Sequence, residues 1–237
     1  MKRLKSTTLR MMLLASVMFL MALSGPYTTE ATTESTKTVP ATSNELLYSK
    51  LNLQSLGLSQ SAYNLAIKGW QKMKAKGLVS KDIVAICDFS QSSNSKRLYI
   101  IDLTSGKLLF NTLVAHGRNT GEEFAKFFSN EPSSYKSSLG FYTTKNTYNG
   151  QHGLSLTLAG QEPGYNNNAE SRAIVMHGAD YVCNQFACNN GRLGRSLGCP
   201  AVSYELSTPI INTIKDGSCL FVYYPDSKYL ASSKILN

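Results

Sequence analysis

Residues 174–202 read IVMHGADYVCNQFACNNGRLGRSLGCPAV, and this stretch indicates both the fold and the chemistry. An apolar, β-branched run ends at His177, and a polar loop that contains two cysteines follows it. Pro200 disfavours the α region at Cys199, so we expect the Cys199 thiol at a constrained, exposed turn. Closely spaced glycines let a backbone approach a ligand and turn its N–H groups toward it. Three of them lead up to the thiol: Gly191, Gly194 and Gly198.

This arrangement is typical of nucleophilic catalysis. A free thiol has a pKa near ~8.5, so at neutral pH it needs a base to become a nucleophile. His177 is a candidate for that base, and the backbone N–H groups of Gly198 and Cys199 are candidates for holding a developing oxyanion. A purely structural interpretation stays open, because a buried cysteine and a hydrogen-bonded histidine at a strand end would have the same spacing.

Short β-branched or aromatic runs lie on both sides of this stretch. Turn signals separate several of them, including Thr104-Ser105-Gly106 and Asn149-Gly150. Short strands with such turns are typical of a sandwich or barrel rather than of alternating strands and helices. We therefore predict a mainly β fold, a β-sandwich or barrel, with strands at 83–89, 98–103, 107–115, 141–144, 154–158, 173–176 and 219–224.

A helical pattern precedes the strands. Between residues 45 and 77 the apolar positions recur on one face, which favours an amphipathic helix packed on the main domain. Ser59 or Ser61 is the expected N-cap, and Gly77 follows the expected end. We predict a helical lead-in at 45–79.

One further helix is expected near the C-terminus, at residues 206–215. Ser207 is its predicted N-cap, Pro209 lies near its first turn and Gly217 lies beyond its end. The main domain is predicted to span 80–237.

The N-terminus has the features of a secretory signal. The apolar run at 11–23 is too short to span a bilayer comfortably and ends in Ala22-Leu23-Ser24, small residues at the positions that a signal peptidase reads. Residues 1–24 are therefore predicted to be a removable signal peptide, and 25–44, rich in Ser and Thr, a disordered linker. We expect an exported protein, periplasmic or in the cell envelope. Four basic residues precede the apolar run: Lys2, Arg3, Lys5 and Arg10.

Composition and charge narrow the class of protein. The 237 residues are 42% hydrophobic and 16% charged, which is typical of a globular chain rather than a disordered or coiled-coil one. The net charge is +9; without residues 1–24 the chain keeps 20 basic and 15 acidic residues, a net charge of +5. This modest excess suits a carboxylate-bearing substrate or an anionic surface. No nucleic acid partner is expected, because no basic and aromatic stripe is present.

Several motifs, in order, resemble one family. The motifs are Val114-Ala115-His116-Gly117-Arg118, Ser137-Ser138-Leu139-Gly140-Phe141-Tyr142, Met176-His177-Gly178-Ala179-Asp180-Tyr181-Val182 and Gly191-Arg192-Leu193-Gly194-Arg195-Ser196-Leu197-Gly198-Cys199-Pro200-Ala201. With these motifs, from about residue 56 to residue 224, the sequence resembles the L,D-transpeptidase catalytic domain family, the YkuD-like fold, in its divergent second subfamily.

The resemblance implies a catalytic β domain that acts on peptidoglycan stem peptides. Cys199 would be the nucleophile, His177 the base, and the Gly178 carbonyl the group that orients the imidazole; Ser196 and Gly198 match the motif around the nucleophile. In this family the thiolate attacks the carbonyl between the third and fourth residues of a tetrapeptide stem and expels D-Ala. A neighbouring stem amine then forms a 3→3 cross-link, or water hydrolyses the thioester. The resemblance implies no cofactor and no metal.

The sequence departs from the family pattern near the nucleophile. Leu197 stands where the family has His, and Ala201 stands where it has Arg or Asn. Arg192 or Arg195 is our candidate for the missing cationic contact to a stem carboxylate, and His116 is a candidate for lining the cleft. These departures keep two alternatives open: an L,D-carboxypeptidase that uses water, and a wall-binding module without catalysis.

The five cysteines are an odd number for an exported chain. If Cys199 is the free nucleophile, two disulfides are possible, Cys183–Cys188 and Cys87–Cys219, although connectivity does not follow from sequence. A zinc site at His177, Cys183, Cys188 and Cys199 lacks the usual ligand spacing. We expect His152, beside the Asn149-Gly150 turn, to be a surface-loop residue.

Overall fold

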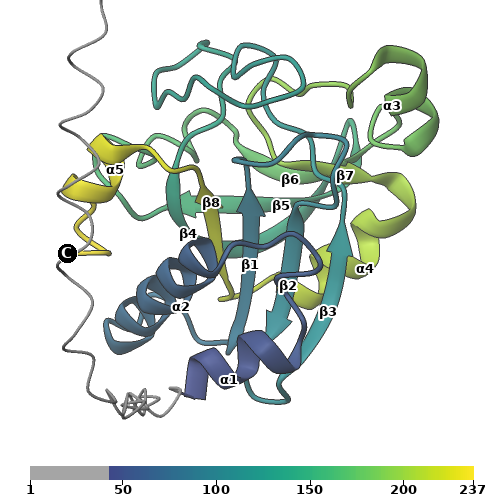
Figure 1. The fold of residues 1–237 in the computed structure, drawn as a ribbon. Helices are drawn as coiled ribbons and strands as arrows, with labels where there is room; N and C mark the ends of the chain where they lie inside the picture. The colour runs from purple at the N-terminus through teal and green to yellow at the C-terminus, as the bar shows by residue number, and fades with distance from the viewer. Residues whose placement is uncertain (1–42) are drawn as a thin grey trace, which may run out of the picture. The chain divides into compact units, whose positions relative to one another are not determined.

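The apolar runs form one curved sheet in a computed structural model that describes residues 43–237 (Figure 1). Within these residues the sheet has eight strands in the order β3-β2-β1-β8-β4-β5-β6-β7. The strands are β1 (Ile83–Asp88), β2 (Leu98–Asp102), β3 (Lys107–Thr112), β4 (Gly140–Gly150), β5 (Gly153–Gly160), β6 (Val175–Ala179), β7 (Ala201–Ser203) and β8 (Cys219–Tyr223). The predicted mainly β class is confirmed.

The sheet bends until its two edges nearly meet. The β1–β8 and β6–β7 pairs are parallel, and the other neighbouring strands are antiparallel. Beyond β3, Ala115 forms an isolated bridge with Ala201 in β7, and its N–H donates to the Ala201 carbonyl at 2.8 Å. This bridge brings the chain that follows one edge strand against the other edge strand, which gives a barrel-like arrangement.

Two helices, rather than one, form the N-terminal lead-in. They are α1 (Ser43–Lys50) and α2 (Gln60–Ala75), and turns separate them. Ser59 is the N-cap of α2, as predicted, and its Oγ accepts the Ala62 N–H at 3.1 Å. The helix α2 packs across β1 and β8 (Figure 1), where it buries Ala62, Ala66 and Met73. Residues 41–237 cluster as one compact unit, so the lead-in belongs to the body that carries the sheet.

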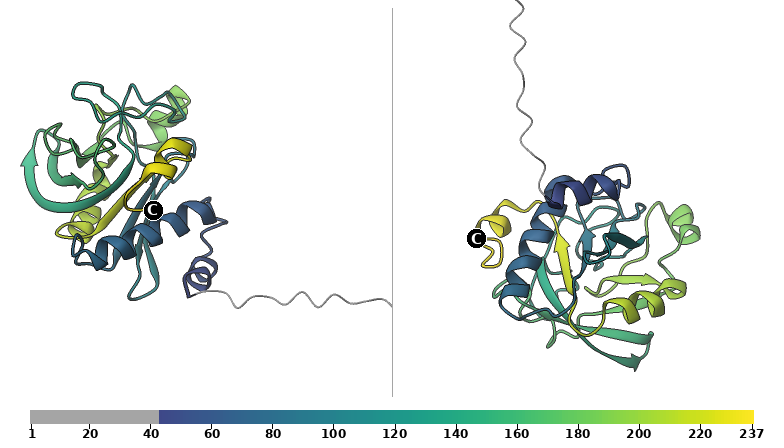
Figure 2. Two further views of the ribbon diagram at one scale, coloured as in Figure 1. Left: turned by 90° about the vertical axis from the view of Figure 1, so that its left-hand side faces the viewer. Right: turned by 90° about the horizontal axis from the view of Figure 1, so that it is seen from below.

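The predicted C-terminal helix is α4 (Tyr204–Ile214), which packs against β5, β6 and β7 on the side that Figure 2 shows from below. Its N-cap is Ser203 rather than Ser207, because the Ser203 Oγ accepts the Leu206 N–H. Ser207 lies inside the helix and donates to the Tyr204 carbonyl.

Two short helices contradict the expectation of a single helix in this half: α3 (Asn184–Asn190) and α5 (Ser227–Ser232). The helix α3 buries none of its residues, so it has no apolar face that a pattern search would detect. The helix α5 is held by buried Glu162, which accepts the Tyr229 hydroxyl at 2.7 Å and also the Ser233 hydroxyl.

The predicted signal peptide, 1–24, lies outside the described residues, as does nearly all of the predicted linker, 25–44. The last two residues of that linker, Ser43 and Asn44, already belong to α1. Within residues 43–237, no helix has the length and apolarity needed to cross a membrane.

Candidate active site

The β6–β7 pair brings His177 and Cys199 together. In its parallel register His177 lies opposite Ala201, and Cys199 lies two residues before Ala201. Residues two apart in an extended chain point to the same side, so the thiol and the imidazole face one space. Both side chains line a cleft of ≈ 640 Å³.

Three segments build this cleft. The β4–β5 hairpin, which Figure 2 shows at the rim of the sheet, supplies part of the lining. The chain that enters β6, β6 itself and the loop before Cys199 supply the rest. The lining residues are Tyr148, Gly150, Gln151, His152, Ser155, Arg172, Ala173, Ile174, Val175, His177, Tyr181, Arg195, Ser196, Leu197 and Cys199.

The imidazole of His177 is held by one ring nitrogen. Its Nδ1 lies 2.8 Å from the Gly178 carbonyl, which can only accept, so Nδ1 carries the hydrogen. This tautomer leaves Nε2 unprotonated, and Nε2 has no hydrogen-bond partner among residues 43–237. Burial lowers the pKa of His177 below its usual value, although the Gly178 carbonyl opposes that shift. His177 is therefore an uncharged ring with a free basic nitrogen at neutral pH.

The Cys199 thiol is protonated at rest. Its Sγ accepts the Val175 N–H at 3.5 Å and donates to the Ala173 carbonyl at 3.7 Å. Burial raises the pKa of the Cys199 thiol, and the Val175 N–H and the Arg172 guanidinium partly offset that rise. The two pKa shifts have opposite directions, so the thiol and the imidazole form a neutral pair rather than a thiolate and an imidazolium.

The turn before Cys199 depends on Ser196 and Gly198. Gly198 has a φ of +127°, and a Cβ there would lie 2.8 Å from the Lys136 carbonyl oxygen, so the position suits only glycine. The Gly198 N–H donates to the Ser196 Oγ at 3.0 Å, and that hydroxyl donates to the Cys199 carbonyl at 2.6 Å. The Ser196 hydroxyl thus closes the turn that presents the thiol.

These hydrogen bonds leave fewer free donors for an oxyanion than the sequence indicated. The Gly198 N–H is already used by Ser196, so in this conformation it is not a free donor. The Cys199 N–H has no hydrogen-bond partner among residues 43–237 and remains available. Sequence spacing indicated two donors, and the described geometry leaves one of them free.

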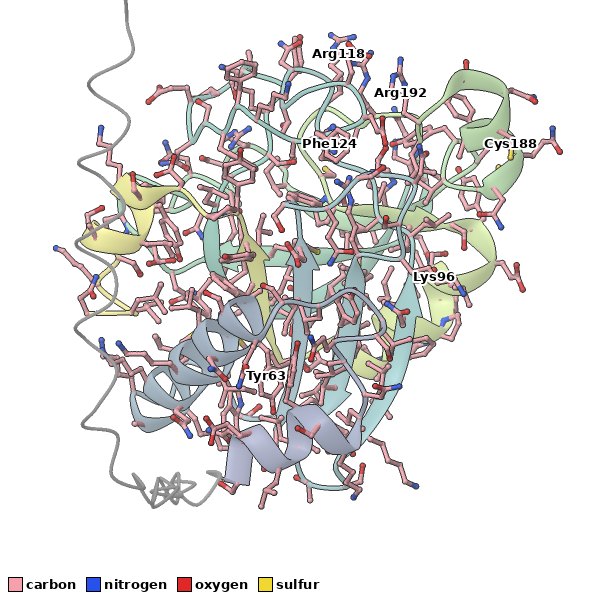
Figure 3. The ribbon with its side chains drawn as sticks, viewed as in Figure 1. Tyr63, Lys96, Arg118, Phe124, Cys188 and Arg192 are labelled. Atoms are coloured by element: carbon pink, nitrogen blue, oxygen red, sulfur yellow. The ribbon has the colours of Figure 1, made fainter. Side chains whose placement is uncertain are left out.

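The two candidate arginines differ in their access to the cleft. Arg195 lines it, and its Nη1 donates to the Arg118 and Gly121 carbonyls and to Glu122, while Nε and Nη2 have no partner among residues 43–237. Arg192 lies outside the cleft lining and donates to the other oxygen of Glu122 at 2.8 Å. Arg192 is drawn at one end of the molecule, beside Arg118 (Figure 3). Arg195 alone of this pair can reach a ligand in the cleft.

His116 lies outside the cleft, contrary to the expectation that it lines it. It is 1% exposed, and both of its ring nitrogens are engaged. Nδ1 accepts from Arg97 Nη2 at 2.7 Å, and Nε2 lies 3.2 Å from the Gly121 carbonyl. Burial and the neighbouring Arg97 lower the pKa of His116 to about 4, so it is an uncharged part of a buried network.

Three residues line the cleft although the sequence did not predict a place for them there. His152 is not simply a surface residue, because its ring stacks on His177 with centroids 4.4 Å apart and planes 21° apart. Arg172 donates to the Ser129 and Lys136 carbonyls and lowers the pKa of Cys199. Tyr181 also lines the cleft. His152 and Arg172 belong to no motif quoted from the sequence, and Tyr181 belongs to the motif around His177 without a role assigned to it there. Each reaches the cleft through strand pairing or loop packing.

All five cysteines are free. The β1–β8 register pairs Cys87 with Val222, three residues from Cys219, so the two thiols point to opposite faces of the sheet. Cys183 caps α3 and Cys188 lies five residues further on, toward another side of the helix; Figure 3 shows Cys188 at the outer edge of the molecule. Among residues 43–237, no group of three or more His, Cys, Asp or Glu side chains is placed to hold a metal ion.

A cysteine and a histidine fixed by a backbone carbonyl share one cleft of a nearly closed β sheet, which is the arrangement that a cysteine nucleophile needs. The family model described as the L,D-transpeptidase catalytic domain matches residues 54–223. The chain belongs to the L,D-transpeptidase catalytic domain family. No curated protein matches the sequence.

The solved structures to which the chain is similar have low sequence identity to it. An L,D-transpeptidase from Mycobacterium smegmatis is 10% identical over 60% of this chain and 59% of its own, with a TM-score of 0.38. The helical cell shape determining protein Pgp2 from Campylobacter jejuni is 12% identical over 68% of this chain and 57% of its own, with a TM-score of 0.38. An L,D-transpeptidase from Stackebrandtia nassauensis is 13% identical over 73% and 75%, with a TM-score of 0.35. The chain thus spans less than two thirds of the first two proteins.

Proposed function

We propose that the protein is an exported cysteine L,D-transpeptidase that acts on tetrapeptide stems of peptidoglycan. The observation that carries the proposal is the shared cleft of Cys199 and His177, in which the imidazole is anchored through Nδ1 and keeps Nε2 free. A base fixed in this tautomer can take a proton only at Nε2.

In the first step His177 Nε2 takes the proton of the Cys199 thiol as the sulfur attacks the carbonyl between the third and fourth residues of the stem. The thiol first turns away from the Ala173 carbonyl, to which it donates at rest. The tetrahedral oxyanion collapses, the carbon–nitrogen bond breaks, and the His177 proton goes to the departing D-Ala amine. A thioester on Cys199 and neutral His177 remain.

In the second step the side-chain amine of a neighbouring stem attacks the thioester. His177 takes a proton from that amine and returns it to the Cys199 sulfur, which leaves as the new amide, the 3→3 cross-link, forms. Water in place of the amine gives a carboxylic acid and a trimmed stem. The same two residues serve both outcomes, so the acceptor decides between a transpeptidase and a carboxypeptidase.

Two groups support the transition state and the substrate. The free Cys199 N–H is the donor for the oxyanion, and one such donor contributes roughly 3 kcal/mol to lowering a barrier. Arg195 lines the cleft, and its free Nε and Nη2 are our candidates for binding a stem carboxylate. The basic, apolar and small-residue pattern of residues 1–24 supports export to the cell envelope.

The test uses purified protein and tetrapeptide-stem muropeptides, with D-Ala release and product mass as the measurements. We expect the unaltered protein to release D-Ala and Cys199→Ala to release none. Cys219→Ala is the matched control, because Cys219 is fully buried in β8 and away from the cleft. Dimers among the products select the transpeptidase, and trimmed stems alone select the carboxypeptidase. Equal release by the unaltered protein and Cys199→Ala, or binding to the wall with no release, overturns the proposal.

A further inference from the structure

His152 lies where it can control the orientation of His177. It sits in the turn between β4 and β5, and strand pairing places that turn beside His177, because Ser155 of β5 lies opposite His177 of β6. The His152 and His177 rings lie nearly parallel, with centroids 4.4 Å apart and planes inclined by 21°. An offset-stacked pair at this separation makes extensive ring contact.

This contact completes the restraint on the imidazole. The Gly178 carbonyl holds the Nδ1 edge at 2.8 Å, which fixes one point of the ring but leaves it free to tilt about that bond. A second ring against one face limits the tilt. His177 is only 4% exposed, whereas His152 is an exposed residue of the turn, so His152 also shields the buried ring from water.

We propose that His152 is a positioning residue for the acyl transfer: its ring covers one face of His177 and sets the plane in which that imidazole meets Cys199. The inference rests on the proposed function, because it assigns a task to His152 in that reaction. His152 itself contacts no reacting atom in the proposal. Its effect passes through the ring of His177.

The same contact couples the charges of the two rings. The ionisable groups that share the cleft with His177 are Tyr148, His152, Arg172, Tyr181, Arg195 and Cys199. Of these, His152 is the one whose charge acts on His177, and a protonated His152 lowers the pKa of His177. Removing the His152 ring removes both this repulsion and part of the burial, and each change makes His177 easier to protonate.

The test compares the unaltered protein with His152→Ala, His152→Phe and the control Asn149→Ala. The substitution His152→Phe keeps a flat ring without a charge, which tests covering separately from repulsion. Asn149 lies in the same hairpin, is exposed and is absent from the cleft lining. The measurements are the His177 ring titration by NMR in the resting protein and the rate of D-Ala release against pH.

We expect His152→Ala to raise the midpoint of the His177 titration, because part of the burial that lowers the pKa of His177 and the repulsion from His152 are both lost. D-Ala release near neutral pH should fall by roughly tenfold because the ring is less well oriented. His152→Phe should recover most of the rate and keep the raised midpoint, and Asn149→Ala should match the unaltered protein.

An unchanged His177 midpoint in His152→Ala, or a full rate in that variant, overturns the inference. So does a rate in His152→Phe as low as that in His152→Ala. The NMR titration needs no turnover, so it separates this inference from the proposed function. If the unaltered protein releases no D-Ala, the proposed function fails, and the positioning role in acyl transfer fails with it even where the titration shows the coupling.

Discussion

Two His-Gly pairs that each follow a predicted strand, His116-Gly117 and His177-Gly178, look alike in the sequence and differ in the structure. Both histidines are nearly fully buried and uncharged. Both nitrogens of His116 are engaged, by Arg97 and by the Gly121 carbonyl. His177 uses one nitrogen and keeps the other free in a cleft. A buried histidine can do acid–base chemistry only when a nitrogen is left for the substrate, and burial alone does not distinguish the two cases.

Replacing each histidine by alanine distinguishes their roles. The loss of activity in His177→Ala is the largest effect that we expect. His177→Ala should lower D-Ala release by ~10³-fold, the usual range for loss of a general base, with a loss of about 1 kcal/mol in unfolding free energy. His116→Ala should lose ~2–3 kcal/mol of unfolding free energy, because buried Arg97 loses an acceptor, yet keep its rate per folded molecule within a few-fold. Steady-state release and urea unfolding measure both. Equal losses of rate in the two variants would contradict the comparison.

The strand pattern and the His177–Cys199 pair could be predicted from the sequence, because alternation, turns and motif spacing are local signals. His152 could not be placed, since its contact depends on β5 pairing with β6 at Ser155 and His177. The use of the Gly198 N–H by Ser196 was missed for a similar reason: only the closed turn shows which donor is occupied. The helix α3 has no buried face, and therefore no periodic signal. Strand pairing and turn closure arise only in the folded chain, so local sequence signals do not reveal them.

The buried His116 should make the free energy of unfolding fall at acid pH. Its pKa is lowered to about 4 in the folded protein, below the ordinary ~6.5 of the unfolded chain. Between these values the unfolded chain binds a proton that the folded protein does not, so the stabilisation is present above pH ~6.5 and is lost as pH falls toward 4. The loss should approach roughly 3 kcal/mol.

Urea unfolding at pH 7 and pH 4.5 measures this loss, and His116→Gln should remove most of the difference. His177, whose pKa is also lowered, contributes with the same sign, so the His116→Gln curve keeps part of the slope. If His116→Gln has the same acid sensitivity as the unaltered protein, His116 is not the group responsible.

The glycines after the two histidines give the finest comparison. A Cβ at Gly178 would lie 2.6 Å from Tyr204 Cδ1 and 2.9 Å from Ser207 Oγ, so only side chains must move, and the Tyr204 side chain is 51% exposed and can turn away. A Cβ at Gly117 would lie 2.6 Å from the Tyr135 carbonyl oxygen and 2.9 Å from the Gly198 Cα, so backbone must move. We expect losses of about 1 kcal/mol for Gly178→Ala and ~2–3 kcal/mol for Gly117→Ala.

The added Tyr204→Ala change should restore part of the stability of Gly178→Ala, because it removes the nearer of the two side chains that obstruct the new methyl group and leaves Ser207. It should do nothing for Gly117→Ala. Gly117→Ala and Gly178→Ala also differ in which part of the molecule must move. Gly117→Ala pushes on Gly198, next to Cys199, so its D-Ala release should fall together with its stability, whereas Gly178→Ala should lose stability alone if Tyr204 absorbs the contact. A rescue of both variants by Tyr204→Ala would mean that the segment near Gly198 is as yielding as an exposed side chain, contrary to the tightly bonded turn around Ser196.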